Sequence, residues 1–195
     1  MTKTLMARFA AAGLCLAGAS TAHTTTPHDK AARDQAIKTA DSQYKADKDA
    51  CKSLSGNAKD ICMQEAKGKE KVAKADAKAQ YDATPKAREN ARLARAEATY
   101  DVAKEKCDDM TGNQKDVCVK EAKAQLTKAK ADAKVDRVAA DTSKNAVQKT
   151  ADAKKDAAED KRDADYKVAV EKCDSLAGNA KDACVRDAKA KYGKS

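Results

Sequence analysis

One twelve-residue segment occurs three times in this chain of 195 residues, and it restricts the possible folds more than any other feature. Each copy begins and ends with cysteine and has a Gly-Asn step at its centre, so the two thiols are placed symmetrically about that step. This is the pattern of a helical hairpin whose arms are joined by a disulfide near the tip. The predicted disulfides pair Cys51 with Cys62, Cys107 with Cys118, and Cys173 with Cys184.

The central step of each copy has the residue types that end one helix and begin the next. Glycine suits the left-handed conformation that commonly ends a helix, and asparagine is a preferred N-cap. The alternative is one unbroken helix through each copy, along which the eleven-residue cysteine spacing rises about 16 Å. A disulfide needs Cα atoms within about 7 Å, so the helix-terminating pair and the thiols together favour the hairpin. The predicted hairpin-turn residues are Gly56, Asn57, Gly112, Asn113, Gly178 and Asn179.

The composition favours long helices that bury little apolar surface. Charged residues make up 36% of the chain and aromatic residues 3%, a balance that is typical of disorder. Strong helix formers fill the sequence, however, and between the turns only Gly68 and Pro85 interrupt them seriously. We therefore predict an all-α fold in which three disulfide-stapled helical hairpin repeats are joined by long Ala/Lys-rich helices. Whether these helices pack as a bundle or extend as a jointed rod stays open.

Two junctions separate the predicted hairpins. Thr84 followed by Pro85 has the chemistry of an N-cap and a first helical residue. The second junction, at 141–143, contains Asp, Thr and Ser, which is also cap-like but has no proline. The expected helices cover 29–55, 58–83, 86–111, 114–140, 143–177 and 180–192. The expected hairpin repeats cover 29–83, 84–140 and 141–195.

The start of the chain has the features of a secretory signal peptide. Lys3 and Arg8 precede a short apolar run, and small residues follow it, so we expect residues 1–22 to be removed and residues 23–28 to form a flexible N-terminal segment. Removal of residues 1–22 takes away Cys15 and leaves six thiols, an even number that favours disulfides in an exported chain. No later segment is apolar enough to cross a bilayer. The expected location is therefore periplasmic or secreted.

The sequence offers few side chains for catalysis. His23 and His28 are the only histidines, and both precede the repeats, so no Ser-His-acid or Cys-His arrangement can form on the helices. The cysteine spacing lacks the close pairing of zinc sites and of redox-active Cys-x-x-Cys motifs. We expect no enzymatic activity, no metal and no cofactor. Removal of residues 1–22 takes away Lys3 and Arg8 and no acidic residue, so the formal net charge falls from +9 to +7. This charge suits loose attraction to anionic envelope polymers, whereas the export signal and the interspersed acids argue against nucleic acid.

Two sequence patterns resemble known exported proteins. The tracts at 69–79 and 128–134 alternate Ala, Lys and Asp or Glu, and they resemble the helical segment of TolA, a protein that spans the periplasm. The Gly-Asn-Ala-Lys-Asp motif between cysteines is similar to small exported Ala/Lys-rich proteobacterial proteins of unknown function, which often receive a TolA-like label. That resemblance implies an exported helical protein and no known activity.

The functional prediction follows from these features. We expect a non-enzymatic exported helical protein with a structural, spacer or adaptor role in the bacterial cell envelope. The alternative is a periplasmic stress chaperone or a binder of anionic polymers. The expected partner is accordingly an envelope protein or an anionic envelope polymer, whose identity the sequence leaves unknown.

Overall fold

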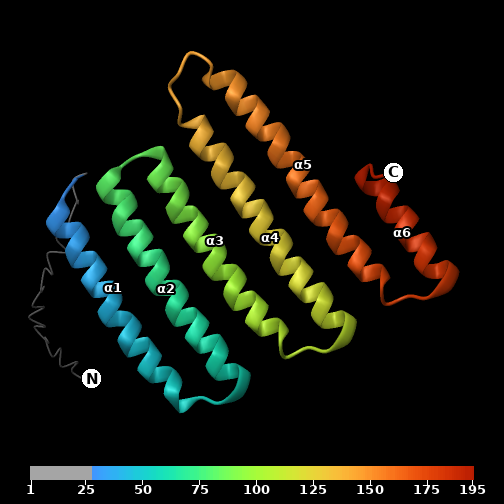
Figure 1. The fold of residues 1–195 in the computed structure, drawn as a ribbon, viewed down its shortest axis with the longest axis horizontal. Coiled ribbons are helices and arrows are strands. Elements are labelled where there is room, and N and C mark those ends of the chain that lie inside the picture. Colours follow the sequence, from blue (N-terminus) through green and yellow to red (C-terminus); the bar gives the residue numbers. More distant parts are fainter. Residues whose placement is uncertain (1–27) are drawn as a thin grey trace, which may run out of the picture.

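The structure, a computed structural model, describes residues 28–195. This part of the chain is all-α, as predicted, and contains no strand (Figure 1). The predicted signal peptide (1–22) and all but the last residue of the predicted flexible segment (23–28) lie outside the described residues. The elements are α1 (Lys30–Ala50), the short 3₁₀ turn η1 (Cys51–Ser53), α2 (Gly56–Asp82), α3 (Pro85–Cys107), α4 (Gly112–Ala139), α5 (Ala146–Cys173) and α6 (Gly178–Tyr192).

The first junction has the predicted cap chemistry. The Thr84 hydroxyl accepts a hydrogen bond from the Ala87 amide at 3.1 Å, and Pro85 is the first residue of α3. Ala83, which follows α2, is left-handed with φ 51°. Only Ala83 and Thr84 therefore separate α2 from α3, and α3 folds back along α2 without a longer loop.

The second junction differs from the prediction. A helix was expected from residue 143, but α4 ends at Ala139 and α5 begins at Ala146. The Asp141 carboxylate accepts hydrogen bonds from both the amide of Ser143 (2.9 Å) and its hydroxyl (3.0 Å). Asp and Ser side chains that bind nearby backbone in this way compete with helix formation. The residues at which α5 was expected to begin thus form a local turn instead, and the helix starts three residues later.

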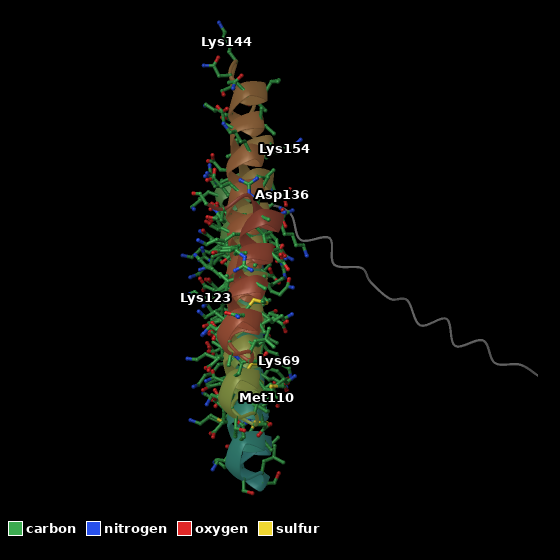
Figure 2. All side chains as sticks on the ribbon, turned by 90° about the vertical axis from the view of Figure 1, so that its right-hand side faces the viewer. Lys69, Met110, Lys123, Asp136, Lys144 and Lys154 are labelled. Carbon is green, nitrogen blue, oxygen red and sulfur yellow. A yellow bond between two sulfur atoms is a disulfide. The ribbon has the colours of Figure 1, made fainter. Side chains whose placement is uncertain are left out.

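The six helices lie side by side in one layer, which is neither of the two expected arrangements. Within the described residues, each helix packs only against the helices that precede and follow it in the chain. Figure 1 shows the resulting zigzag, with the clasped turns along one edge, and Figure 2 shows that the layer is one helix thick. We refer to α1 and α2 as hairpin 1, to α3 and α4 as hairpin 2, and to α5 and α6 as hairpin 3.

The buried residues form narrow seams between neighbouring helices instead of one central core. Apart from Gly68 and Glu89, the buried side chains of the described residues belong to alanine and to the first cysteine of each disulfide. Alanine allows helices to approach closely but removes little apolar area from water per residue. Burial alone is therefore a weak source of stability for this layer, and the covalent and polar contacts between helices matter more.

Gly68 lies inside α2, within the helix expected over 58–83, although glycine is a poor helix former. The residue is buried, and a Cβ atom at this position would lie 2.9 Å from the Cβ atom of Ala98 on α3. Real Cβ atoms do not approach so closely. The glycine thus allows α2 and α3 to touch, which outweighs its cost to the helix of about 1 kcal/mol relative to alanine.

Ion pairs connect neighbouring helices of the layer. Glu97 of α3 holds Lys71 of α2 at 2.6 Å with one carboxylate oxygen and Lys130 of α4 at 3.3 Å with the other. Arg95 of α3 pairs with Asp76 of α2 at 2.6 Å, and Arg92 pairs with Asp136 of α4. Hairpin 2 is therefore tied through α3 to hairpin 1, and α3 is also tied to its own partner α4.

These pairs predict that acid weakens the layer. Lys71 holds the pKa of Glu97 below its ordinary value of 4.5, against an opposing effect of burial. Burial acts to raise the pKa of Glu89, but Lys86 and Arg137 outweigh it and the net shift is again downward. A carboxylate with a lowered folded pKa adds stability above its unfolded pKa, and that stability is lost as the pH falls through the folded pKa.

We therefore expect the urea midpoint to be constant near neutral pH and to fall below about pH 4. Glu97→Gln is the matched variant: it should be less stable than the parent at neutral pH, and it should lose less stability on acidification. An equal loss in the parent and in Glu97→Gln would contradict this role of the carboxylate.

Candidate functional site at the disulfide-clasped edge

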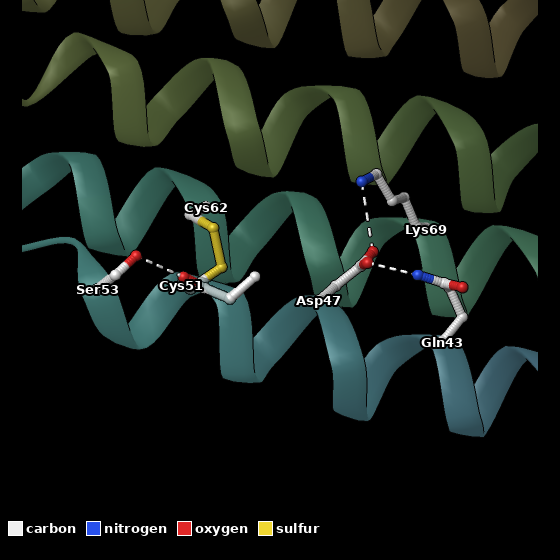
Figure 3. The surroundings of a disulfide bond; sticks show 7 residues. Gln43, Asp47, Cys51, Ser53, Cys62 and Lys69 are labelled. Carbon is white, nitrogen blue, oxygen red and sulfur yellow. Dashed lines mark hydrogen bonds and ion pairs between the residues drawn. A yellow bond between two sulfur atoms is a disulfide. The ribbon is translucent and has the colours of Figure 1, made fainter.

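The three disulfides pair as the sequence predicted. Cys51–Cys62, Cys107–Cys118 and Cys173–Cys184 are bonded, with Cα atoms 5.6, 5.7 and 5.7 Å apart. The first cysteine of each pair has no solvent exposure, whereas the second is partly exposed. Figure 3 shows the first bridge joining the end of α1 to α2. Each bridge therefore closes one hairpin next to its turn.

The turn glycines are left-handed, but they lie at a different place in the turn from the one predicted. Gly56, Gly112 and Gly178 have φ values of 54°, 56° and 54° and are the first residues of α2, α4 and α6. They were expected to end the preceding helices. Those helices instead end in a tight turn at the first cysteine, whose carbonyl accepts from the amide three residues later, at 3.1, 3.0 and 2.9 Å in the three copies.

The turn asparagines do not cap their own helices, which corrects the second part of the prediction. The residues before the glycines, Ser55, Thr111 and Ala177, take the extended N-cap position, and none makes a side-chain cap. The asparagines thus fall inside the first helical turn, from which their side chains can reach a neighbouring hairpin.

Two asparagines form hydrogen bonds between hairpins. The Asn57 side-chain amide donates to the Glu105 carbonyl of α3 at 3.1 Å, and that of Asn113 donates to the Glu171 carbonyl of α5 at 3.0 Å. Both acceptors lie in the last turn of a helix, where carbonyls lack a full set of helical partners. The edge of hairpin 1 is thereby tied to hairpin 2, and the edge of hairpin 2 to hairpin 3.

Asn179 provides a natural control for these bonds. It occupies the same position in hairpin 3 as Asn57 and Asn113, but it is exposed and no helix follows α6 in the described chain. We expect Asn113→Ala to lower the free energy of unfolding by about 1 kcal/mol, because it leaves a carbonyl in the seam without this donor. Asn179→Ala should change it by less than about 0.5 kcal/mol. Equal urea midpoints for the two variants would contradict the proposed contribution of the seam bond.

Lysine and glutamate reinforce the same seams. Lys106, next to Cys107, lies 3.7 Å from Glu65 of α2, and Lys172, next to Cys173, lies 2.6 Å from Glu121 of α4. In the second seam Lys120 also contacts the Glu171 carboxylate at 3.0 Å. The equivalent positions of these pairs in successive hairpins indicate that the seam is itself a repeated unit.

Ion pairs also support the turns themselves. Asp108 lies 2.8 Å from Lys115 across the second turn, and this hydrogen bond raises the pKa of the lysine. Asp174 and Lys181 form the same pair across the third turn at 2.9 Å. In hairpin 1, Asp47 instead binds Gln43 at 2.6 Å and Lys69 at 3.3 Å (Figure 3). The second and third turns are therefore held by an ion pair in addition to the disulfide, whereas in hairpin 1 the pair joins α1 to α2 farther from the turn.

The side chains described at this edge make structural contacts. All cysteines of the described residues are in disulfides, and no cluster of three potential metal-ligating side chains occurs among these residues. None of the described helices combines the length and apolar character needed to cross a membrane. His28 donates its backbone amide to the Tyr81 carbonyl at 2.9 Å and packs edge-on against the Tyr81 ring, away from the clasped turns. The turn tips expose Leu54, Met110 and Leu176 by 42 to 43%.

Comparison of this chain with protein-family models, with curated proteins and with solved structures found no match.

Proposed function

We propose that this protein is a non-enzymatic spacer or scaffold of the bacterial cell envelope. The observation that carries the proposal is the single layer of helices in which every hairpin is closed by a disulfide and neighbouring hairpins are packed together. Covalent closure at each repeat suits an oxidising compartment, in which disulfides persist. A layer of this kind keeps its shape without a large apolar core.

The dimensions suit a role in holding partners apart. Helices of 27 and 28 residues, such as α2 and α4, are about 40 Å long at 1.5 Å per residue. Six helices at interaxial distances of roughly 9 Å give a layer on the order of 55 Å wide and one helix thick. Since each helix contacts only its neighbours, the length of the layer depends on the number of hairpins, as in other repeat architectures.

The pattern of charges on the broad faces favours a spacer over a surface that binds anionic polymers nonspecifically. Several lysines and arginines on these faces are matched by carboxylates on the adjacent helix, as in the Lys71–Glu97 and Arg95–Asp76 pairs. Paired charges attract distant polyanions weakly, because opposite signs lie within one Debye length of each other.

Binding of anionic polymers is the second candidate function, and one feature favours it. Lys67, Lys71, Lys74 and Lys78 follow one another at helical spacing and so share one face of α2. Two of them are engaged: Lys71 by Glu97, and Lys74 by Asp41 at 2.5 Å and by Glu70 at 2.7 Å. The row therefore offers less free charge than its sequence suggests.

Affinity capture from a crosslinked envelope fraction distinguishes the two functions. The bait is the full chain, and the control is the variant in which all three cysteine pairs are alanine. A scaffold should retain a defined partner through a wash at about 0.5 M salt, which screens exposed charges, and the control should lose it. Release of all bound material by that wash would favour the polymer binder. Retention of the same partner by the control would contradict a role that depends on the clasped shape.

A further inference from the structure

The outer side of α6 repeats the residues with which α2 and α4 hold the next hairpin. Asn57 and Asn113 are half-buried donors to the following hairpin, and Asn179 is their exposed equivalent. The disulfides establish that these asparagines are equivalent, because Cys184 occupies in hairpin 3 the position of Cys62 and Cys118 in the other two hairpins. Hairpin 3 therefore has the first element of a seam but no hairpin to which it can be joined in the described chain.

A basic residue and a small residue of α6 are also equivalent to seam residues of the other hairpins. Arg186 lies two residues after Cys184, the position of Lys120 after Cys118, and Lys120 contacts the Glu171 carboxylate at 3.0 Å. Ala190 is the exposed equivalent of Gly68, which lies at the close approach of α2 and α3. The donor, the cation and the small residue of a seam thus occur together on the free side of α6.

The outer side of α1 has the matching acceptors. Asp49 lies two residues before Cys51, as Glu105 and Glu171 lie two residues before Cys107 and Cys173. It is exposed and pairs only with Lys52, at 2.8 Å, within its own turn. Ser42 takes the place of Ala98, so a small residue again stands where close approach is needed. In the described part of the chain, the outer sides of α1 and α6 therefore match in the hydrogen-bonding group, in one charge pair and in the small residue.

We propose that a second copy of this chain docks head to tail, with the outer side of its α1 on α6 of the first copy. Asn179 donates to the Asp49 carbonyl of the second copy, Arg186 pairs with the Asp49 carboxylate, and Ala190 packs against Ser42. This contact continues the internal seam. Because it joins different surfaces of the two copies, it leaves a free α1 and a free α6 at the ends and generates an open ribbon.

The contact is short and therefore weak. α6 has 15 residues, whereas α2 and α4, which form the internal seams, have 27 and 28. A single short helix pair buries less than the roughly 800 Å² per partner of a stable interface, so the assembly is reversible and depends on concentration. The proposed assembly goes beyond the spacer function, which holds for a single chain as well.

Variants that exchange the charges at Asp49 and Arg186 test the proposal. Sedimentation velocity measures the association of each variant and of the parent chain at protein concentrations from about 10 µM to about 1 mM. Asp49→Arg and Arg186→Asp should each weaken association by about tenfold or more, because each places like charges together. The double variant restores the pair with exchanged charges and should associate as the parent does. Glu159→Arg is the matched control for Asp49→Arg, because it makes the same charge change at an exposed position of α5 away from both edges.

Mixing the single variants adds a second readout. An equimolar mixture of Asp49→Arg with Arg186→Asp should associate more strongly than either variant alone, because every α1 then meets a complementary α6. A parent chain that stays monomeric at the highest concentration would overturn the proposal. So would association that resists both single exchanges, or that responds to Arg186→Asp alone, since the latter indicates pairing of α6 with another α6. Circular dichroism of each variant shows whether it has the parent fold.

Discussion

Replacing all six paired cysteines with alanine is expected to unfold the layer near about 37 °C. Each disulfide closes a short loop between residues eleven apart, which is worth about 3 kcal/mol in the chain-entropy treatment. Three such loops contribute roughly as much as the whole stability of a typical domain. The seams bury mainly alanine, which recovers little of this loss. Far-UV circular dichroism during heating should therefore show loss of helix at a much lower temperature than in the parent chain.

Variants that lack one disulfide at a time show which hairpin depends most on its bridge for stability. The variant without the Cys173–Cys184 bridge should lose mainly the α5–α6 contact, because α6 has no helix on its other side in the described chain. The variant without the Cys107–Cys118 bridge should be less stable, because hairpin 2 lies between the other two hairpins. Hydrogen exchange of α6 and α4 measures this difference. A triple variant with the melting temperature of the parent would show that the seams alone hold the layer.

Gly68→Leu is expected to give the second largest effect, a loss of about 2 to 3 kcal/mol in the free energy of unfolding. A Cβ atom alone would lie 2.9 Å from the Ala98 Cβ atom, and leucine adds three further carbon atoms beyond that Cβ atom. The helices must then separate, and the Lys71–Glu97 and Arg95–Asp76 pairs, which join the same two helices, are strained or lost. Urea unfolding measures the change.

Two further variants separate packing from helix propensity. Lys67→Leu places the same residue at the adjacent exposed position of α2, where it meets no seam, and should change the stability by less than about 0.5 kcal/mol. Ala98→Gly, added to Gly68→Leu, should restore part of the loss by making room on α3. Equal effects of Gly68→Leu and Lys67→Leu would contradict the close approach of α2 and α3.

The cysteine pairing and the cap of α3 could be predicted because their causes are local in the chain. The symmetric thiols about each Gly-Asn step require a hairpin, and Thr84 with Pro85 caps α3 through the Ala87 amide three residues later. The start of α5 was predicted less well. Asp141 and Ser143 have the residue types of a cap, but their side chains bond with one another and with nearby backbone instead.

The contacts between hairpins could not be predicted, because their partners are distant in the sequence. Asn57 and Asn113 are preferred N-caps by residue type, but their acceptors lie 48 and 58 residues away. Gly68 gives a partial signal: a glycine among strong helix formers often marks a close approach to another backbone. Nothing in the sequence near Gly68 identifies Ala98 as the residue it meets.

The sequence by itself determined the helices, the three bends and the disulfide that closes each bend, since helical hydrogen bonds and eleven-residue loops connect near neighbours. Only the tertiary structure decided that the helices form one flat layer and that the asparagines and Gly68 serve the seams. The physical reason is that alanine has no directional preference and can pack on any side of a helix. The arrangement in space is then selected by sparse polar and close-packing contacts between residues far apart in the chain.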